Sequence, residues 1–207
     1  EMLNTEMPPK KARGCLKEIN KHSLVVTVKD AVQRKSEIPL LSLACAIAKR
    51  GKFETIIEKA TELGVHEIFP LKTQQGEVII PSERAVNKKA RFTTVALNAA
   101  KQSKRSTIPL IHDQIAFGEL ITRLPKDVFA IIPSLKEKKK TLLETLSYAQ
   151  SPVKVMIFIG PEGDFSDEEY ALADECKVNP VTLGETILKV ETAAISALAF
   201  VHLYYHS

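Results

Sequence analysis

From residue 39 onward, short runs of consecutive apolar residues alternate with longer stretches in which apolar residues recur every three or four positions. The runs predict buried strands, and the longer stretches predict helices with one face on a core. The predicted strands are residues 40–48, 65–71, 128–132, 155–159 and 180–183. The predicted helices are residues 53–63, 82–101 with Ser82 as N-cap, 117–124, 137–148, 193–205 and one that begins after Ser166. Alternating strands and helices predict an α/β fold with a parallel sheet.

The first 38 residues follow another pattern. Residues 7–11 (MPPKK) form a basic stretch that disfavours a helix, and residues 23–28 are rich in β-branched residues, which favour a strand. We therefore expect a small N-terminal β domain over residues 1–38 and an α/β domain over residues 39–207.

Two loops stand out because each follows a predicted buried strand and leads into a helix. They are residues 159–165 (IGPEGDF) and residues 183–192 (LGETILKVET). In an open α/β sheet, such loops gather at the carboxyl ends of the strands, where ligands bind. The sequence therefore predicts a ligand site between them.

The first of these loops has two glycines and a proline within four residues, so its backbone is able to approach a ligand closely. Ser166 and Glu169 have the spacing of a capping box. The nearby acids Asp164, Asp167, Glu168 and Glu169 would repel an anion at this helix start. A positively charged or neutral, adenosine-like ligand fits this loop better than a phosphate.

Composition adds few constraints. The 207 residues carry 29 basic and 25 acidic side chains, and this mild excess permits an RNA partner but is equally typical of a solvated surface. Three cysteines without a C-x-x-C pair indicate neither disulfides nor a zinc site and suggest the cytoplasm. The five histidines lack metal-ligand spacing, so we expect no metal. We also expect neither a membrane span nor a signal peptide.

Four segments in order resemble the RsmE family of SPOUT methyltransferases. The two loops, IGPEGDFS and LGETILKVETA, are similar to the family's IGPEGG(F/L)S and LGxRILRTETA. Residues 52–65 match K-x6-KATELGV, and residues 102–105 (QSKR) match the end of the family's EQSxR segment. The resemblance covers roughly residue 45 to the C-terminus.

The resemblance implies a SPOUT-type parallel sheet with a C-terminal trefoil knot, preceded by a partial PUA-like β-barrel. It implies a cytoplasmic homodimer that uses S-adenosylmethionine to methylate N3 of a uridine in 16S rRNA of the small ribosomal subunit. The residues that it assigns to the cofactor are Pro133, Ser134, Gly160, Glu162, Gly163, Leu183, Gly184, Ile187 and Leu188.

Methyl transfer to N3 of uridine requires loss of the N3 proton, and a nearby cation would stabilise the resulting anion. By resemblance, Arg105 and Lys189 are the candidate catalytic residues, although either could be a solvent-facing charge. The candidate RNA-binding residues are Lys49, Arg50, Lys52, Lys104 and Arg105, which suit phosphates but read no sequence.

The chain departs from the family pattern at several positions. Lys189 replaces an arginine, which removes a planar bidentate donor. Thr186 replaces the other arginine of this loop, Asp164 replaces a glycine, and Lys101 replaces a glutamate. For Glu191, capping of the last helix and orientation of Lys189 are both open. Alternative hypotheses are a non-catalytic RNA-binding or ribosome-assembly protein, and a SPOUT methyltransferase with another RNA target.

Overall fold

A computed structural model describes residues 10–21, 23–33, 39–49, 51–135, 140–149 and 152–206. Its centre is an eight-stranded sheet with the order β5-β4-β3-β9-β7-β10-β8, in which β6 also pairs with β4. All pairs in this sheet are parallel. The strands are β3 (Leu40–Ala46), β4 (Glu67–Lys72), β5 (Leu110–Ile111), β6 (Ile115–Ala116), β7 (Val128–Pro133), β8 (Lys140–Thr141), β9 (Lys154–Ile159) and β10 (Asn179–Thr182). The predicted α/β fold with a parallel sheet is confirmed.

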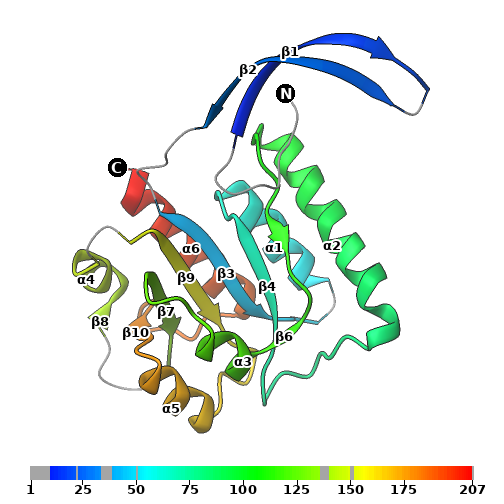
Figure 1. Ribbon diagram of the computed structural model, residues 1–207. Coiled ribbons are helices and arrows are strands. Elements are labelled where there is room, and N and C mark those ends of the chain that lie inside the picture. The colour runs from blue at the N-terminus through cyan, green and yellow to red at the C-terminus, as the bar shows by residue number, and fades with distance from the viewer. Residues whose placement is uncertain are drawn as a thin grey trace.

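Helices cover both faces of this sheet (Figure 1). One face carries α1 (Lys52–Glu62), α2 (Ser82–Gln102), α4 (Leu142–Ser147) and α6 (Val190–His206). The other face carries α3 (Phe117–Thr122) and α5 (Asp167–Glu175). The core therefore forms two layers, one on each side of the sheet.

The central strand β3 shows why the strand patterns are continuous rather than alternating. Leu41, Leu43 and Cys45 pack in the layer beneath α1 and α6, and Ala44 packs in the layer beneath α3 and α5. Because a parallel sheet covered on both faces buries every side chain of a central strand, nearly all of its residues are apolar.

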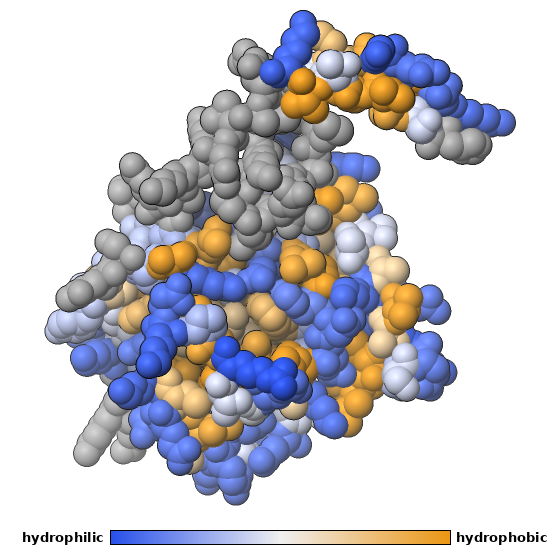
Figure 2. All heavy atoms as spheres, in the orientation of Figure 1, coloured by the Kyte–Doolittle hydropathy of each residue, from blue (hydrophilic) through white to orange (hydrophobic). Residues whose placement is uncertain are grey.

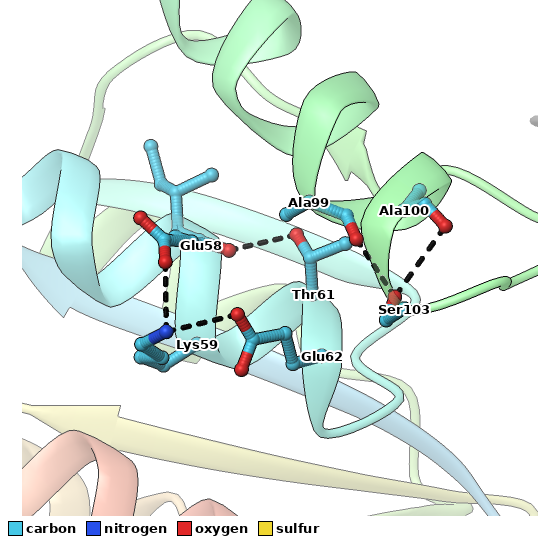
Figure 3. Close-up of polar contacts among 8 residues, drawn as sticks. Glu58, Lys59, Thr61, Glu62, Ala99, Ala100 and Ser103 are labelled. Carbon is cyan, nitrogen blue, oxygen red and sulfur yellow. Dashed lines mark hydrogen bonds and ion pairs between the residues drawn. The ribbon is translucent and has the colours of Figure 1, made fainter.

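Helices α1 and α2 pack against each other through the rings of Phe53 and Phe92, whose centroids are 5.0 Å apart. The polar side chains at their ends have local partners (Figure 3). Lys59 Nζ lies 2.7 Å from Glu58 Oε1 and 2.9 Å from Glu62 Oε1. Ser103 Oγ, just after α2, donates to the Ala99 carbonyl at 2.8 Å. These contacts lie near the carboxyl ends of α1 and α2, which lead to the amino-terminal ends of β4 and β5 and not to the two predicted ligand loops.

Several predicted boundaries were wrong. Strand β4 begins at Glu67 rather than at residue 65, α3 ends at Thr122 rather than at residue 124, and α6 begins at Val190 rather than at residue 193. The helix expected over residues 137–148 is instead β8 followed by α4, because Thr141 and Glu144 form a capping box that starts the helix at Leu142. Residues 137–139 of this prediction lie outside the described residues. Pro81 rather than Ser82 is the N-cap of α2. Strand β3 ends at Ala46, two residues before the predicted end.

The N-terminal region contains a hairpin of β1 (Lys10–Ile19) and β2 (Leu24–Gln33) that extends away from the α/β body (Figure 1). Its strand over residues 24–28 agrees with the sequence pattern, whereas residues 7–9 of the basic stretch lie outside the described residues. Several apolar side chains of the hairpin are exposed and form an apolar band along it (Figure 2). They are Leu16, Ile19, Leu24, Val25 and Val28.

The last helix, α6, has apolar residues on nearly every face. Its residues Ala194, Ala197 and Leu198 are fully buried, but Phe200 and Leu203 are 40% and 66% exposed. One side of α6 is therefore apolar and uncovered in the single chain. Among the described helices, none combines the length and apolar character that crossing a bilayer requires.

Candidate functional site

A cavity of about 470 Å³ lies at the carboxyl ends of β7, β9 and β10. Three loops line it, one after each strand, and Ala193 of α6 completes the wall. Its size is that of a typical small-molecule site, and its place is where open α/β sheets bind ligands. The predicted meeting of the two loops after β9 and β10 is thus present in the structure.

The structure brings together all but one of the residues that sequence reasoning assigned to a cofactor. The cavity is lined by Pro133, Ser134, Gly160, Glu162, Leu183, Gly184, Ile187 and Leu188. Gly163 is the exception and lies outside the lining. Further lining residues that sequence reasoning did not assign to the cofactor or to catalysis are Leu135, Ile159, Pro161, Asp164, Thr182, Glu185, Thr186, Val190 and Ala193. Their signal in the sequence was a place in or beside the two loops or, for Leu135, adjacency to the assigned residues Pro133 and Ser134.

The three glycines of these loops serve different purposes. A Cβ atom on Gly160 would lie 3.1 Å from two ring carbons of Phe165, a side chain that is only 3% exposed. A Cβ atom on Gly163 would lie 2.6 Å from Oε1 of Gln75. Gly184 has open space around it but a φ of +126°, which side chains rarely adopt. Gly160 is therefore required by packing and Gly184 by backbone conformation.

The predicted capping box at the start of α5 is confirmed. Ser166 Oγ accepts a hydrogen bond from the Glu169 amide at 3.1 Å, and Glu169 Oε2 accepts one from the Ser166 amide at 2.9 Å. The other carboxylate oxygen, Oε1, accepts from the Gln74 amide at 2.9 Å. Both side chains are buried, so this box ties the loop after β9 to the loop after β4.

A second polar connection joins two walls of the cavity. Tyr170 Oη on α5 donates to Asp164 Oδ1 at 2.7 Å, and the Phe165 amide donates to the same oxygen at 2.9 Å. Tyr170 also hydrogen-bonds with Ser134 at the end of β7. Burial, assisted by Asp164, raises the pKa of Tyr170, so its hydroxyl keeps its proton at neutral pH.

The ionisable side chains of the cavity are mostly acidic. Glu162, Asp164 and Glu185 line it together with one lysine, Lys189. Glu168 and Glu169, which also entered the sequence argument, line a separate hollow between α3 and α5. The cavity itself therefore favours a cationic or neutral ligand over an anionic one.

Lys189 is exposed at the edge of the cavity, and its carbonyl accepts the Ala193 amide in the first turn of α6. Glu191, two residues on, has a lowered pKa because its own backbone amide and then Lys52 hydrogen-bond to its carboxylate. Lys52 Nζ lies 3.3 Å from Glu191 Oε1. Two roles were considered for Glu191, capping of the last helix and orientation of Lys189. These contacts agree with capping, and the lysine that pairs with Glu191 is Lys52.

Arg105, the other predicted catalytic residue, does not reach the cavity. Its NH1 group donates to the carbonyls of Thr61 and Val65 at 2.7 and 2.8 Å, and NH2 donates to Thr107 Oγ1 at 3.2 Å. These partners lie at the amino-terminal end of β4, opposite the cavity end of the sheet. Burial lowers the pKa of Arg105 to about 10, which still leaves it charged. Within one chain, Arg105 is therefore a structural clamp: its guanidinium joins the end of α1 to the segments that precede β4 and β5.

The predicted RNA-binding residues fall into two groups. Lys49 and Lys52 lie beyond the carboxyl end of β3, where Lys49 pairs with Glu77 and Lys52 with Glu191. Lys104 is exposed after α2, beside Arg105 at the opposite end of the sheet. Arg50 lies outside the described residues. Only the first group is near the cavity end of the sheet.

In the described part of the chain, no three His, Cys, Asp or Glu side chains are grouped so that they would hold a metal ion. The three cysteines are free: Cys15 is exposed, Cys45 is buried and Cys176 is partly buried. Burial raises the pKa of the Cys45 thiol, so it is not a reactive thiolate.

The fold and the cavity define an α/β protein that binds a small ligand between the loops after its parallel strands. Comparison with known proteins gives the family. Residues 34–202 match the RNA methyltransferase domain family, and the chain belongs to that family. The chain is 32% identical over 189 residues to the ribosomal RNA small subunit methyltransferase E of Rickettsia conorii, covering 91% of this chain and 74% of that protein. This relationship confirms the resemblance to the RsmE family.

Two further comparisons agree. The ribosomal RNA small subunit methyltransferase E of Bacillus subtilis is 28% identical over 189 residues, covering 89% of this chain and 74% of that protein. The crystal structure of the Neisseria gonorrhoeae enzyme of the same name, bound to S-adenosylmethionine, superposes with a TM-score of 0.77. It is 27% identical, and the match covers 95% of this chain and 79% of that one.

Proposed function

We propose that this protein is an S-adenosylmethionine-dependent methyltransferase that methylates N3 of a uridine in 16S rRNA of the small ribosomal subunit. The observation that carries the proposal is the cavity enclosed by the loops after β7, β9 and β10. It is supported by membership of the RNA methyltransferase domain family and by the cofactor-bound Neisseria gonorrhoeae structure. An rRNA substrate would place the reaction in the cytoplasm.

The residues of the cavity fit the proposed cofactor. Leu183, Leu188 and Pro133 offer apolar contacts and backbone groups for an adenosine. Glu162 and Asp164 offer carboxylates for the positively charged methionine part. When bound, S-adenosylmethionine supplies a methyl group that its sulfonium has already activated. The protein's part is then to align the uridine with that methyl group and to stabilise charge.

Lys189 is the candidate for stabilising the uridine anion, because it is the cation in the cavity lining. Its ammonium would favour loss of the N3 proton and hold the negative charge that spreads onto the carbonyl oxygens of the base. Arg105 is engaged with backbone carbonyls elsewhere, so this chain's own Arg105 takes no part in the step.

RNA binding is proposed for two regions. Lys49 and Lys52 lie near the cavity end of the sheet and suit backbone phosphates, as does Lys104 at the other end. The β1–β2 hairpin is proposed to belong to a PUA-like β domain that grips RNA, which its uncovered apolar band supports. Choice of the uridine would then depend on RNA shape and on an unstacked base.

A trefoil knot and a homodimer complete the proposal. Pro133 at the end of β7 and Lys140 at the start of β8 both pair with Val181, on opposite sides of β10. The segment that joins β7 to β8 therefore begins and ends beside β10, on its two opposite sides. Threading of α6 through this connection would form the knot. The exposed Phe200 and Leu203 of α6 support a contact with a second subunit.

The proposed activity is tested with purified protein, S-adenosylmethionine carrying a labelled methyl group, and small ribosomal subunits from cells that lack the gene. We expect calorimetric binding of the cofactor, transfer of label to 16S rRNA, and 3-methyluridine in its nuclease digest by mass spectrometry. Lys189→Ala should retain cofactor binding but transfer label at least about tenfold more slowly.

Other outcomes separate the alternatives. Binding of rRNA without any binding of millimolar S-adenosylmethionine would favour the non-catalytic RNA-binding protein. Label in a nucleotide other than 3-methyluridine would favour a methyltransferase with another target. A knot would be tested by pulling the chain from residue 128 and the C-terminus in optical tweezers, where a knotted chain extends less than its residue number allows.

A further inference from the structure

Asp164 occupies a backbone conformation that a glycine would adopt without strain. Its φ is +66°, and its amide closes a turn by donating to the Pro161 carbonyl at 3.0 Å. An L-residue other than glycine is disfavoured in this left-handed region, although Asp and Asn are tolerated there. The cost of this conformation suggests that the side chain contributes something at this position.

The carboxylate of Asp164 is held in place from two directions. The Phe165 amide and the Tyr170 hydroxyl both donate to Oδ1, at 2.9 and 2.7 Å. Neither of these hydrogen bonds uses Oδ2. Since Tyr170 belongs to α5, the orientation of the carboxylate is fixed by a helix rather than by the loop alone.

Asp164 is one of the residues that line the cavity, so its carboxylate contributes negative charge to the cavity wall. Glu162 of the same loop also lines it, so the wall after β9 carries two negative charges. The cation of the lining, Lys189, comes from the opposite loop after β10. The wall that holds Asp164 therefore selects for positive charge.

We propose that Asp164 is a specificity-determining residue, which makes the cavity prefer the cationic methyl donor S-adenosylmethionine over its demethylated product S-adenosylhomocysteine. This inference rests on the proposed function. The two compounds share the adenosine, the ammonium and the carboxylate, and they differ by one methyl group and one positive charge at sulfur. A fixed negative charge in the cavity wall attracts the additional positive charge of the donor and has no such attraction for the uncharged sulfur of the product.

The test is calorimetric titration of the wild-type protein and Asp164→Asn with each compound. Asparagine has nearly the same shape, tolerates the same backbone conformation, and its Oδ1 accepts the same two hydrogen bonds. We expect the ratio of the two dissociation constants to fall by about three- to tenfold in Asp164→Asn, because affinity for the donor drops while affinity for the product is retained. High salt should also reduce the preference of the wild-type protein for S-adenosylmethionine over S-adenosylhomocysteine, because it screens the charge of Asp164.

Two controls make the result specific. Glu175→Gln removes one exposed negative charge from the end of α5, outside the cavity lining, and should leave the ratio unchanged. An analogue that carries an ammonium in place of the sulfonium should lose affinity in Asp164→Asn as the donor does. Equal losses for donor and product, or an unchanged ratio, would overturn the inference. If the wild-type protein bound neither compound, the proposed function itself would fail.

Discussion

Gly160 lies so close to Phe165 that a Cβ atom on it would stand 3.1 Å from ring carbons Cδ2 and Cε2. The ring cannot easily move away, because it packs against Phe117 at a centroid distance of 4.8 Å and is almost fully buried. This contact fixes the path of the loop after β9, which forms one wall of the cavity. It explains a glycine that the sequence pattern alone would attribute to a tight turn.

Gly160→Ala should therefore destabilise the protein by about 1–3 kcal/mol and weaken binding of S-adenosylmethionine. Urea unfolding and calorimetry measure the two effects. Gly163→Ala is the matched control, since its one close contact would be with Oε1 at the far end of the exposed Gln75 side chain, which is able to turn aside. A loss of stability at position 163 as large as that at position 160 would contradict this reading of the loop.

Arg105→Ala should lower the free energy of unfolding by about 2–3 kcal/mol, because the carbonyls of Thr61 and Val65 would lose a buried charged donor. Affinity for S-adenosylmethionine should stay within about twofold of wild type, since Arg105 lies at the far end of the sheet. Lys189→Ala should instead leave the free energy of unfolding nearly unchanged and slow the transfer of the methyl group. If Arg105→Ala folded with unchanged stability but failed to bind the cofactor, its assignment as a structural clamp would be wrong.

His66 should make the protein less stable in mild acid. Burial, and then the charge of Arg105, lower the pKa of His66 from 6.5 to about 4. The folded state therefore binds this proton less readily than the unfolded chain, so the stabilisation is complete above pH 6.5 and is lost as the pH falls from 6.5 to about 4. The loss amounts to at most about 3 kcal/mol.

Urea unfolding from pH 4 to 8 tests this prediction. In His66→Gln, which cannot take up a proton, the fall in stability over this range should be smaller by the His66 contribution. His202, whose pKa burial also lowers, is present in both proteins and cancels in the comparison. Parallel curves for the two proteins would rule out the prediction.

The two capping boxes offer a paired experiment. Ser166→Ala and Thr141→Ala each remove the side-chain acceptor of a helix N-cap, and each should cost about 1 kcal/mol in thermal or urea unfolding. Only Ser166→Ala should also weaken S-adenosylmethionine binding, because the bond from the Glu169 amide to Ser166 Oγ ties the loop after β9, which lines the cavity, to the start of α5. Equal cofactor affinity in the two variants would show that this tie does not support the cavity.

The sequence by itself determined the local elements and the two ligand loops. Continuous apolar runs such as residues 155–159 define buried strands wherever helices cover both faces of a sheet, and Ser166 with Glu169 defines a helix start through contacts three residues apart. The meeting of the loops after β9 and β10 followed from these local signals, because parallel strands bring such loops to one edge.

Only the tertiary structure decided which side chains share a site. Arg105 and Lys189 are both cations in segments that match the family, yet the first lies at the amino-terminal end of the sheet and the second in the cavity. The hydrogen bond between Tyr170 and Asp164 and the packing of Gly160 on Phe165 likewise depend on how α5 folds back over the sheet. Local patterns carry the period and ends of each element, but distances between elements arise only from packing of the whole core.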